Sequence, residues 1–358
     1  MAGRIKLLIL TPIILTLILF CFGASRLFFS SSSVISRSLP GNTLPQSDSR
    51  TNVLLLGIDK RAPGEVQSGV LTDTIMLASI PHNEGKIVIV SIPRDLWIAE
   101  YRAKINEIYG MLGANDASAE ALKKAVSGAL GVPVHFQVQV GFGGFKEAVD
   151  TLGGVSIDVQ NTFDDYRYPV SGRENDTCEL TEEQILEGKE EDYQVSEIDY
   201  PCRFEHTHFD KGAITMNGDV ALKYARSRHS TNPAERGDFA RAKRQQQVIL
   251  AVRNKALSMG TLLNPKKIAD LYGIYQKYFA TDITVSDAQV LFSLAIKANI
   301  SEVKTAVLTN SSIEDGMGAG LLYAPADRSP YGGKWVVVPK GGSFAGVHAF
   351  VQKLLFGN

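Results

Sequence analysis

A short arginine-rich segment carries side chains suited to holding a phosphate. Arg226 and Arg228 are two residues apart, so an extended backbone would point them to the same side. Arg241 and Gln245 are four residues apart in a helical pattern and share a face, with Asp238 one turn earlier to hold Arg241. Because guanidinium groups make paired hydrogen bonds to phosphate oxygens, the segment predicts an anion site. A solvated basic helix is the alternative.

Carboxylates at the ends of apolar runs add a second chemical function. Asp59 directly follows the first of three short apolar runs, Asp73 opens the second, and Arg94 and Asp95 follow the third. If the runs are neighbouring strands, these side chains cluster at one edge of a sheet. Mg²⁺ binds one or two protein carboxylates together with phosphate oxygens and water. The sequence therefore predicts a divalent cation, Mg²⁺ or Mn²⁺, holding a pyrophosphate; for either aspartate alone, a turn or cap role is the alternative.

The elements that must position these groups alternate between strands and helices. The three apolar runs are typical of strands covered on both faces, and the patterns between and after them predict helices and further strands. The predicted elements are strands at 52–58, 74–80 and 86–92, a helix from Ser118 to the stop at Gly131, a strand at 133–140, a helix at 145–154 and a strand at 155–159. After residue 258, two helices, a strand near 334–339 and a last helix complete the same domain. The fold class is α/β with a largely buried central sheet.

The N-terminus predicts a membrane anchor. Residues 7–23 contain no charge in 17 positions and follow Arg4 and Lys6. We interpret residues 1–29 as a cytoplasmic stub and an uncleaved transmembrane signal anchor; a cleaved signal peptide is the alternative. The positive-inside rule then leaves a Ser/Pro-rich linker, residues 30–51, and the domain, residues 52–358, outside the cytoplasm of a single-pass plasma-membrane protein.

The net charge of −1 conceals strong local charges. Residues 1–50 carry +4, residues 171–205 carry −9, and residues 223–244 carry +5. The near-neutral total excludes a generally basic nucleic-acid binder. We interpret residues 171–205 as a solvated acidic insertion, and we expect it to point away from the anion site because its carboxylates would repel an anionic substrate.

Three cysteines are consistent with export. Cys21 lies in the apolar segment, which leaves Cys178 and Cys202 as the pair in the body of the protein. An exported domain is where a disulfide can persist, and this one would close a loop of about 25 residues, contributing roughly 3.5 kcal/mol in the chain-entropy model. Two unpaired, small hydrophobic side chains are the alternative. His206 and His208 lie near Cys202, but no paired C-x-x-C spacing supports a zinc site.

Seven segments in order resemble the LytR-CpsA-Psr family, also called cell-envelope-related transcriptional attenuators. They are NVLLLGID (52–59), TDTIMLASI (72–80), VSIPRDLW (90–97), KIN (104–106), FGGFKEAVDTLGGV (142–155), MNGDVALKYARSRH (216–229) and GDFARAKRQQQ (237–247), within core motifs spanning 52–257. The resemblance implies a central mixed β-sheet flanked by helices on both faces. It also implies a magnesium-dependent phosphotransferase that moves a glycopolymer from a polyprenyl-pyrophosphate carrier to a cell-wall acceptor, usually peptidoglycan, through a phosphodiester.

The family motifs assign roles to individual residues. Asp59 and Asp73 match the metal-site aspartates, and with Arg94, Arg226 and Arg228 they form the predicted catalytic set. The pyrophosphate-binding set is Arg94, Lys104, Arg226, Arg228, Arg241 and Gln245, with Asp238 in support. The family also has an apolar pocket for the prenyl chain, which residues 134–140 and 142–152 could line, although ordinary core packing is the alternative for each residue.

The chain departs from the family pattern just before Asp73, and its loop between Arg228 and Asp238 is a few residues longer than is usual in the family. Leu71 and Thr72 stand where the family commonly has an arginine shortly before the aspartate matched by Asp73. One anion contact is therefore missing or supplied elsewhere. Two rival functions also remain: hydrolysis of the prenyl pyrophosphate with the same residues, and a non-enzymatic module that binds polyprenyl lipids or wall polymers.

Overall fold

The computed structural model describes most of the extracytoplasmic part predicted from the sequence. The described residues are 44–58, 70–173, 176–179, 200–297, 303–309 and 320–357. Within these ranges, no helix is both long enough and apolar enough to cross a bilayer. The predicted anchor, residues 1–29, and Asp59 lie outside the described residues.

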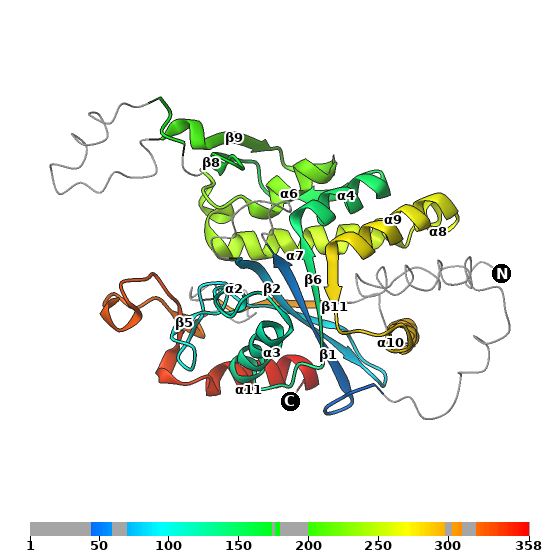
Figure 1. Ribbon diagram of the computed structural model, residues 1–358, viewed down its shortest axis with the longest axis horizontal. Coiled ribbons are helices and arrows are strands. Elements are labelled where there is room, and N and C mark those ends of the chain that lie inside the picture. Colours follow the sequence, from blue (N-terminus) through cyan, green and yellow to red (C-terminus); the bar gives the residue numbers. More distant parts are fainter. Residues whose placement is uncertain are drawn as a thin grey trace.

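A six-stranded mixed sheet forms the centre of the molecule (Figure 1). In spatial order its strands are β11 (Phe279–Thr281), β6 (Phe136–Gly141), β1 (Arg50–Ile58), β2 (Thr72–Pro81), β3 (Val88–Ser91) and β12 (Lys304–Val307). β1 and β6 are parallel, as are β3 and β12, whereas the other neighbours are antiparallel. The mixed sheet implied by the family resemblance is thus confirmed, and both edge strands come from the region after residue 258.

β1 explains why the sheet is covered on both faces. Its residues alternate between two hydrophobic clusters: Leu54 and Leu56 face one, while Val53 and Leu55 face the other, and all four are buried. A strand with two buried faces reads as a continuous apolar run, which is the pattern seen in the sequence. β1 begins at Arg50, two residues before the predicted start of the domain.

Helices pack on each face of the sheet (Figure 1). One face is covered by α2 (Ile108–Met111), α3 (Asp116–Leu130) and α11 (Ala345–Phe356), whose side chains join the cluster of Leu54 and Leu56. The opposite face is covered by α7 (Gly237–Ala256) and α10 (Val285–Lys297). The predicted helices on both faces are therefore confirmed.

A further layer lies on the outer side of α7 (Figure 1). It contains α4 (Phe142–Leu152), α6 (Gly218–Arg226), α8 (Met259–Leu262) and α9 (Pro265–Tyr278). It also contains two antiparallel strand pairs, β7 (Val155–Val159) with β10 (Gly212–Met216) and β8 (Phe163–Pro169) with β9 (Phe204–Phe209). On the other side of the sheet are two smaller pairs, β4 (Trp97–Ile98) with β5 (Ala103–Lys104) and β13 (Leu322–Tyr323) with β14 (Val338–Pro339). The predicted strand at 155–159 is β7, which belongs to the outer layer rather than to the central sheet.

The sequence predicted the C-terminal end of α3 correctly but not its N-cap residue. Ser118 is not the N-cap, as the sequence suggested; Asn115 caps the helix and Ser118 completes a reciprocal capping box with it. At the other end, Gly131 takes the left-handed conformation (φ 71°) that ends a helix, as predicted. The error arose because asparagine and serine are both good caps and stand three residues apart.

Candidate active site

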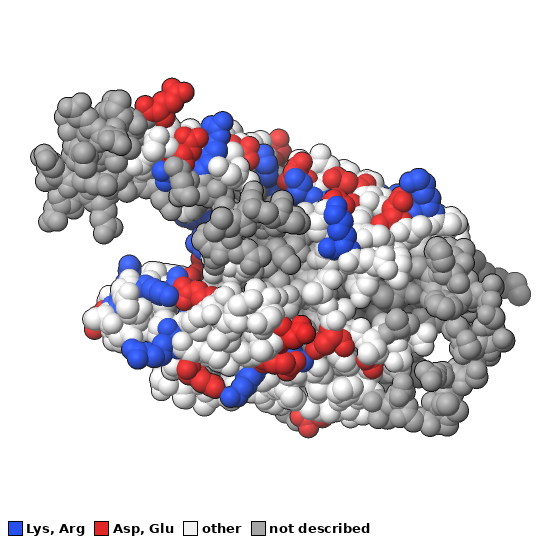
Figure 2. All heavy atoms as spheres, in the orientation of Figure 1, with Lys and Arg blue, Asp and Glu red and all other residues white. Residues whose placement is uncertain are grey.

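A charged pocket opens beside one end of the central sheet. Five arginines and two aspartates line it, so its formal charge is +3 with histidine neutral. Its lining residues are Asp73, Thr74, Arg94, Phe142, Asp165, Arg167, Pro169, Phe204, Arg226, Arg228, His229, Arg241 and Gln245. Figure 2 shows the surface hollowed between the layer of β8 and β9 and the layer that carries β5, with acidic and basic side chains at the base of the hollow.

The strand connections bring the first two charged residues together. Because β2 is antiparallel to β1 and β3, the end of β1, the start of β2 and the end of β3 lie at the same edge of the sheet. Asp73 is the second residue of β2, Arg94 follows β3, and Nη1 of Arg94 is 2.7 Å from Oδ1 of Asp73. The predicted clustering at a sheet edge is confirmed for this pair.

Asp238 lies at the centre of three guanidinium groups. Its Oδ1 is 3.0 Å from Nε of Arg228, 2.9 Å from Nη2 of Arg241 and 3.9 Å from Nε of Arg94. Asp238 is in the first turn of α7, where the helix dipole also favours a carboxylate. The prediction that Asp238 holds Arg241 is confirmed, and Asp238 positions two further arginines as well.

These contacts keep Asp73, Asp238 and Arg241 ionised at neutral pH. Burial alone would raise the pKa of the Asp73 carboxyl, but the charges of Arg94 and Arg241 outweigh it and hold that pKa below its ordinary value. The pKa of Asp238 is lowered in the same way by Arg241, Arg228 and Arg94. Burial lowers the pKa of Arg241 to about 10, which still leaves the guanidinium charged.

Arg226 and Arg228 reach the pocket by a different backbone path from the one predicted. Arg226 is the last residue of α6, so the backbone is not extended across the pair. The chain leaves the helix at Ser227, and buried Asp165 fixes the following loop: its Oδ2 accepts hydrogen bonds from Oγ of Ser227 (2.6 Å) and from the backbone N–H of Arg228 (3.0 Å) and His229 (3.1 Å). The helix end and the anchored loop together bring both arginines into the pocket.

An apolar cavity of about 180 Å³ adjoins the charged pocket. It lies between strands of the central sheet and the helices α4, α6, α7 and α9. Its lining residues are Leu55, Leu56, Gly57, Thr74, Val138, Val140, Gly141, Phe142, Phe145, Ala148, Val149, Leu152, Leu222, Ala225, Arg226, Gln245, Val248, Ile249, Val252, Leu271, Tyr275 and Phe279. Members of both predicted lining runs, 134–140 and 142–152, are present.

Four residues line both spaces: Thr74, Phe142, Arg226 and Gln245. The guanidinium of Arg226 lies 4.5 Å from the centre of the Phe142 ring, an arrangement that supports a cation on an aromatic face. Gly57 faces Thr74 across the β1–β2 pair, and a Cβ at residue 57 would stand 2.8 Å from Cβ of Thr74. Glycine therefore lets the strands close up where the two spaces meet.

Lys104 does not line the charged pocket, and Asp59 is not among the described residues. Nζ of Lys104, on β5, is 2.7 Å from Oδ1 of Asp95, which in turn lies 3.6 Å from Arg94. Lys104 is not among the residues that line the pocket, so it supports Arg94 through Asp95. Asp59 directly follows Ile58 in the sequence but lies outside the described residues, and its predicted metal role stays a prediction.

Asp165, Arg167 and His229 also line the pocket, although no sequence pattern predicted them. His229 follows a predicted arginine directly, whereas Asp165 and Arg167 come from β8, far away in the sequence. No local signal singled them out, because only the pairing of β8 with the loop after α6, through the Asp165–Ser230 bridge, brings them together. Of the three, Arg167 adds positive charge to the pocket, in a chain that lacks an arginine at residues 71 and 72.

The acidic insertion is described only in part. Three of its carboxylates are described, Asp176, Glu179 and Glu205, and none of the three lines the pocket. Glu205 pairs instead with Lys223 at 2.8 Å. Cys178 and Cys202 form a disulfide within this region.

Comparisons with known proteins identify relatives over much of the chain. The cell wall biosynthesis protein LcpA of Corynebacterium glutamicum is 29% identical over 63% of the chain, and teichoic acid transferases named TagU from Oceanobacillus iheyensis and Bacillus cereus are 26% and 29% identical over 70% and 65%. The matches span 43%, 65% and 60% of those relatives' own lengths.

Solved structures share the fold. TagV of B. subtilis superposes with a TM-score of 0.54 at 23% identity, covering 87% of this chain and 98% of TagV. A structure described as TagT bound to LIIa-WTA gives a TM-score of 0.51 at 22% identity, covering 86% of this chain and 91% of TagT. The sequence pattern of the LytR_cpsA_psr family matches residues 29–328, which is well over half of the chain. With the mixed sheet, the arginine cluster and this match in agreement, the protein belongs to the LytR_cpsA_psr family.

Proposed function

We propose that the protein is a phosphotransferase that moves a glycopolymer from a polyprenyl-pyrophosphate carrier to a cell-wall acceptor, peptidoglycan, through a phosphodiester. The observation that carries the proposal is the junction of the charged pocket with the apolar cavity through Arg226, Gln245, Phe142 and Thr74. A lipid pyrophosphate has a charged head joined directly to an apolar tail, and the junction matches that change of polarity. The names of the TagU relatives, teichoic acid transferases, agree with this substrate class.

The charges of the pocket suit a pyrophosphate diester. Such a group carries about two negative charges, against a formal lining charge of +3. Nε of Arg94, Arg228 and Arg241 is buried without an aligned hydrogen bond among the described residues. Nε of Arg228 faces Oδ1 of Asp238 at 3.0 Å, so the N–H groups of this pocket-lining guanidinium that Asp238 does not occupy favour a ligand with several oxygen acceptors. Phosphate oxygens are such acceptors.

In the proposed reaction, an acceptor hydroxyl oxygen attacks the phosphorus on the glycopolymer side of the pyrophosphate. A new P–O bond forms, the P–O bond to the bridging oxygen breaks, and polyprenyl phosphate leaves with the electron pair; the hydroxyl proton passes to a base or to water. Charge on the phosphoryl oxygens is stabilised by the arginines fixed around Asp238, so preorganised electrostatics supplies much of the rate. The apolar cavity holds the leaving lipid in line with the pocket.

The residues present fit a divalent cation. Asp73 offers a hard carboxylate oxygen at the pocket wall, and its lowered pKa keeps it ionised at neutral pH. Asp73, with Asp59 from the family resemblance, would hold Mg²⁺ or Mn²⁺. The ion would neutralise charge on the pyrophosphate. A carboxyl with a lowered pKa is a weak base, so Asp73 suits this role better than deprotonation of the acceptor.

We also propose that residues 1–29 anchor the protein in the plasma membrane, with the pocket outside the cytoplasm. The uncharged run of 17 residues and its positive flank support this placement, as does the lipid-linked substrate. A reporter enzyme that is active only after export, fused after residue 358, would be active in cells. Activity of a reporter that works only in the cytoplasm would contradict the placement.

Product analysis tests the proposed reaction. The purified full chain is incubated with a labelled glycan on polyprenyl pyrophosphate, with and without peptidoglycan oligomers, in Mg²⁺. We expect label to enter peptidoglycan through a phosphodiester only when the acceptor is present, and chelation of divalent ions to abolish it. Release of glycan phosphate at the same rate without acceptor would identify a hydrolase. Tight binding of the lipid without either product would identify a binding module.

A further inference from the structure

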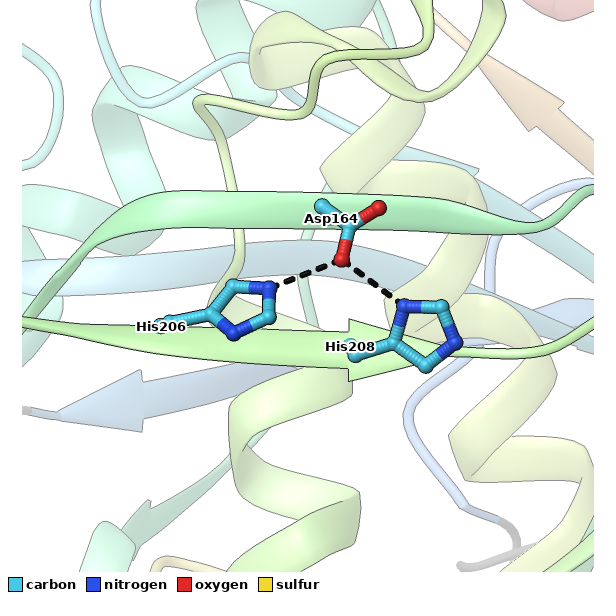
Figure 3. Close-up of side chains that lie close together, drawn as sticks. All are labelled: Asp164, His206 and His208. Atoms are coloured by element: carbon cyan, nitrogen blue, oxygen red, sulfur yellow. Dashed lines mark hydrogen bonds and ion pairs between the residues drawn. The ribbon is translucent and has the colours of Figure 1, made fainter.

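Three side chains converge on one face of the β8–β9 pair (Figure 3), and none of them lines the charged pocket. Asp164 on β8 is the register partner of His208 on β9, and His206 is two residues before His208 on the same face. Oδ1 of Asp164 lies 2.7 Å from Nε2 of His206 and 2.8 Å from Nδ1 of His208. One carboxylate oxygen thus faces two imidazole nitrogens, and the three ligand atoms all lie within 4.8 Å of one another.

Neighbouring side chains orient both rings. Nε2 of His208 lies 3.2 Å from Oδ1 of Asp210. Tyr166 stacks on the His206 ring, with centroids 4.2 Å apart and planes at 9°. A metal-bound histidine usually donates its second ring N–H to a carboxylate, which fixes the tautomer and the ring orientation. His208 has this arrangement with Asp210.

The two carboxylates beside His208, Asp164 and Asp210, compete for one ring proton when the imidazole is neutral. A neutral imidazole has one N–H, so it can donate to Asp164 or to Asp210 but not to both. A cation between Nδ1 of His208 and Oδ1 of Asp164 would replace the first hydrogen bond and leave Nε2–H for Asp210. Both carboxylates would then have a partner while the ring stays neutral.

We propose that Asp164, His206 and His208 form a binding site for a transition-metal dication of the Zn²⁺ type. Two imidazole nitrogens and one carboxylate oxygen are a common protein set for Zn²⁺, with water in the fourth position. The donor set differs from the all-oxygen set that suits Mg²⁺ in the charged pocket.

The side chains must spread slightly to admit the ion. Bond lengths of about 2.0 to 2.1 Å in a tetrahedral site place neighbouring ligand atoms roughly 3.3 Å apart. The Asp164–histidine distances are shorter by about half an ångström. His206 and His208 are 46% and 44% exposed, so small side-chain rotations can make this room without disturbing the core.

The site has a structural consequence for the charged pocket. Asp164 and Asp165 are consecutive residues of β8 and point to opposite faces. Asp165 anchors the loop of Arg228, and the backbone O of Asp164 accepts a hydrogen bond from the N–H of Thr231 in the same loop (2.8 Å). The register of β8 and β9 shifts just beyond Asp165. A metal that links β8 to β9 at Asp164 would therefore stabilise the strand to which the loop of Arg228 is anchored.

Metal binding by the full chain tests this assignment directly. The protein is stripped with chelator, dialysed into excess Mg²⁺ and titrated with Zn²⁺ in a calorimeter. We expect one Zn²⁺ per chain, and we expect His206→Ala and Asp164→Asn each to weaken it by more than about tenfold, since even outer partners of ligands are worth 10- to 100-fold. Asp210→Asn should have a smaller effect. Thermal melts establish that each variant is folded.

Matched variants separate this site from the others. His348→Ala, a histidine on α11, and Asp73→Asn, in the charged pocket, should bind Zn²⁺ like the unmodified protein. In the oxidised protein, Co²⁺ should give d–d bands without a thiolate charge-transfer band, because Cys178 and Cys202 are joined in a disulfide and Cys21 belongs to the apolar N-terminal run. Absence of stoichiometric Zn²⁺ binding, or equal binding after His206→Ala and Asp164→Asn, would overturn the proposal. Loss of transfer activity with Zn²⁺ binding intact would instead concern the charged pocket alone.

Discussion

The charged pocket and the apolar cavity meet at four shared residues but are held in shape by different interactions. In the pocket, Arg94, Arg228 and Arg241 surround one carboxylate, that of Asp238, and each distance depends on the others. In the cavity, apart from the shared Arg226, uncharged side chains such as Val138, Val149 and Val248 pack from the sheet and two helices. One space is positioned by mutual electrostatics and the other by packing.

This difference predicts how each space responds to change. Electrostatic stabilisation of a phosphoryl group depends steeply on position, so moving one guanidinium should affect the rate more than the fold. An apolar cavity that holds a flexible lipid depends on shape and volume, and it tolerates substitutions that keep both. Variants in the charged pocket should therefore alter the rate of the reaction, whereas variants in the apolar cavity should alter lipid binding.

Arg228→Ala should have the largest effect. Removal of one positioned donor to a developing charge typically costs about 10²- to 10³-fold in kcat. We expect a loss of this size in glycan transfer with a thermal midpoint close to that of the unmodified protein, because Arg228 is one-third exposed. Lys243→Ala removes a basic charge from α7 outside the pocket lining and should leave kcat nearly unchanged. Equal losses in both variants would mean that overall charge, not position, controls the rate.

Asp238→Ala should have the second-largest effect, and we expect it in the stability of the protein. It leaves Arg241, which is only 6% exposed, without its nearest carboxylate, and breaking a buried pair from one side costs about 3 to 5 kcal/mol. We expect a loss near the lower limit in the free energy of unfolding by urea. Inorganic pyrophosphate should restore part of it by supplying the missing negative charge.

Asp270→Ala is the matched control for Asp238→Ala. It breaks the exposed Lys266–Asp270 pair on α9 and should cost less than about 1 kcal/mol. If both aspartate variants lose the same small amount of stability, the pocket is not held together by its central carboxylate.

Ala148→Phe should affect lipid binding without affecting chemistry. Ala148 is on α4 and lines the apolar cavity but not the charged pocket. We expect the KM for a long polyprenyl carrier to rise about tenfold, as for poorly matched apolar groups, while a short-chain carrier keeps its kcat and KM. Ala213→Phe, at an exposed position of β10, is the control. Equal effects on long and short carriers would contradict a lipid-binding role for the cavity.

Local pattern predicted the sheet better than the outer layer. β1, β2 and β3 were recognised because both of their faces are buried, so each strand contains an uninterrupted stretch of apolar residues. β12 was missed because it is a short edge strand whose place depends on pairing with β3, a long-range contact that leaves little periodicity. The extended backbone expected at Arg226 was wrong because α6 continues through that residue.

The sequence predicted those site residues whose proximity follows from their spacing within one segment or from neighbouring strands. Arg241, Gln245 and Asp238 lie within two turns of one helix, so spacing alone placed them together. Asp73 and Arg94 required strand neighbours, which the apolar runs supplied. Asp165 and Arg167 could not be found in this way, because their part in the pocket depends on β8 meeting a loop more than 60 residues away in the sequence.

The smallest effect that we expect is a dependence of protein stability on acid pH, which should differ between the charged pocket and the apolar cavity. The pKa of Asp73 is lowered in the folded protein, so its contribution to stability is complete above the unfolded value of about 3.9 and is lost as the pH falls through the folded value. The stability difference between the unmodified protein and Asp73→Asn, measured by urea unfolding, should therefore shrink below about pH 4, at up to about 1.4 kcal/mol per unit of pKa shift. Ala148→Phe changes no titrating group, so its stability difference should stay constant over the same range. A difference for Asp73→Asn that persists unchanged to about pH 2 would mean that the Asp73 carboxylate is not stabilised by the arginines around it, and that the two spaces are held by the same kind of interaction.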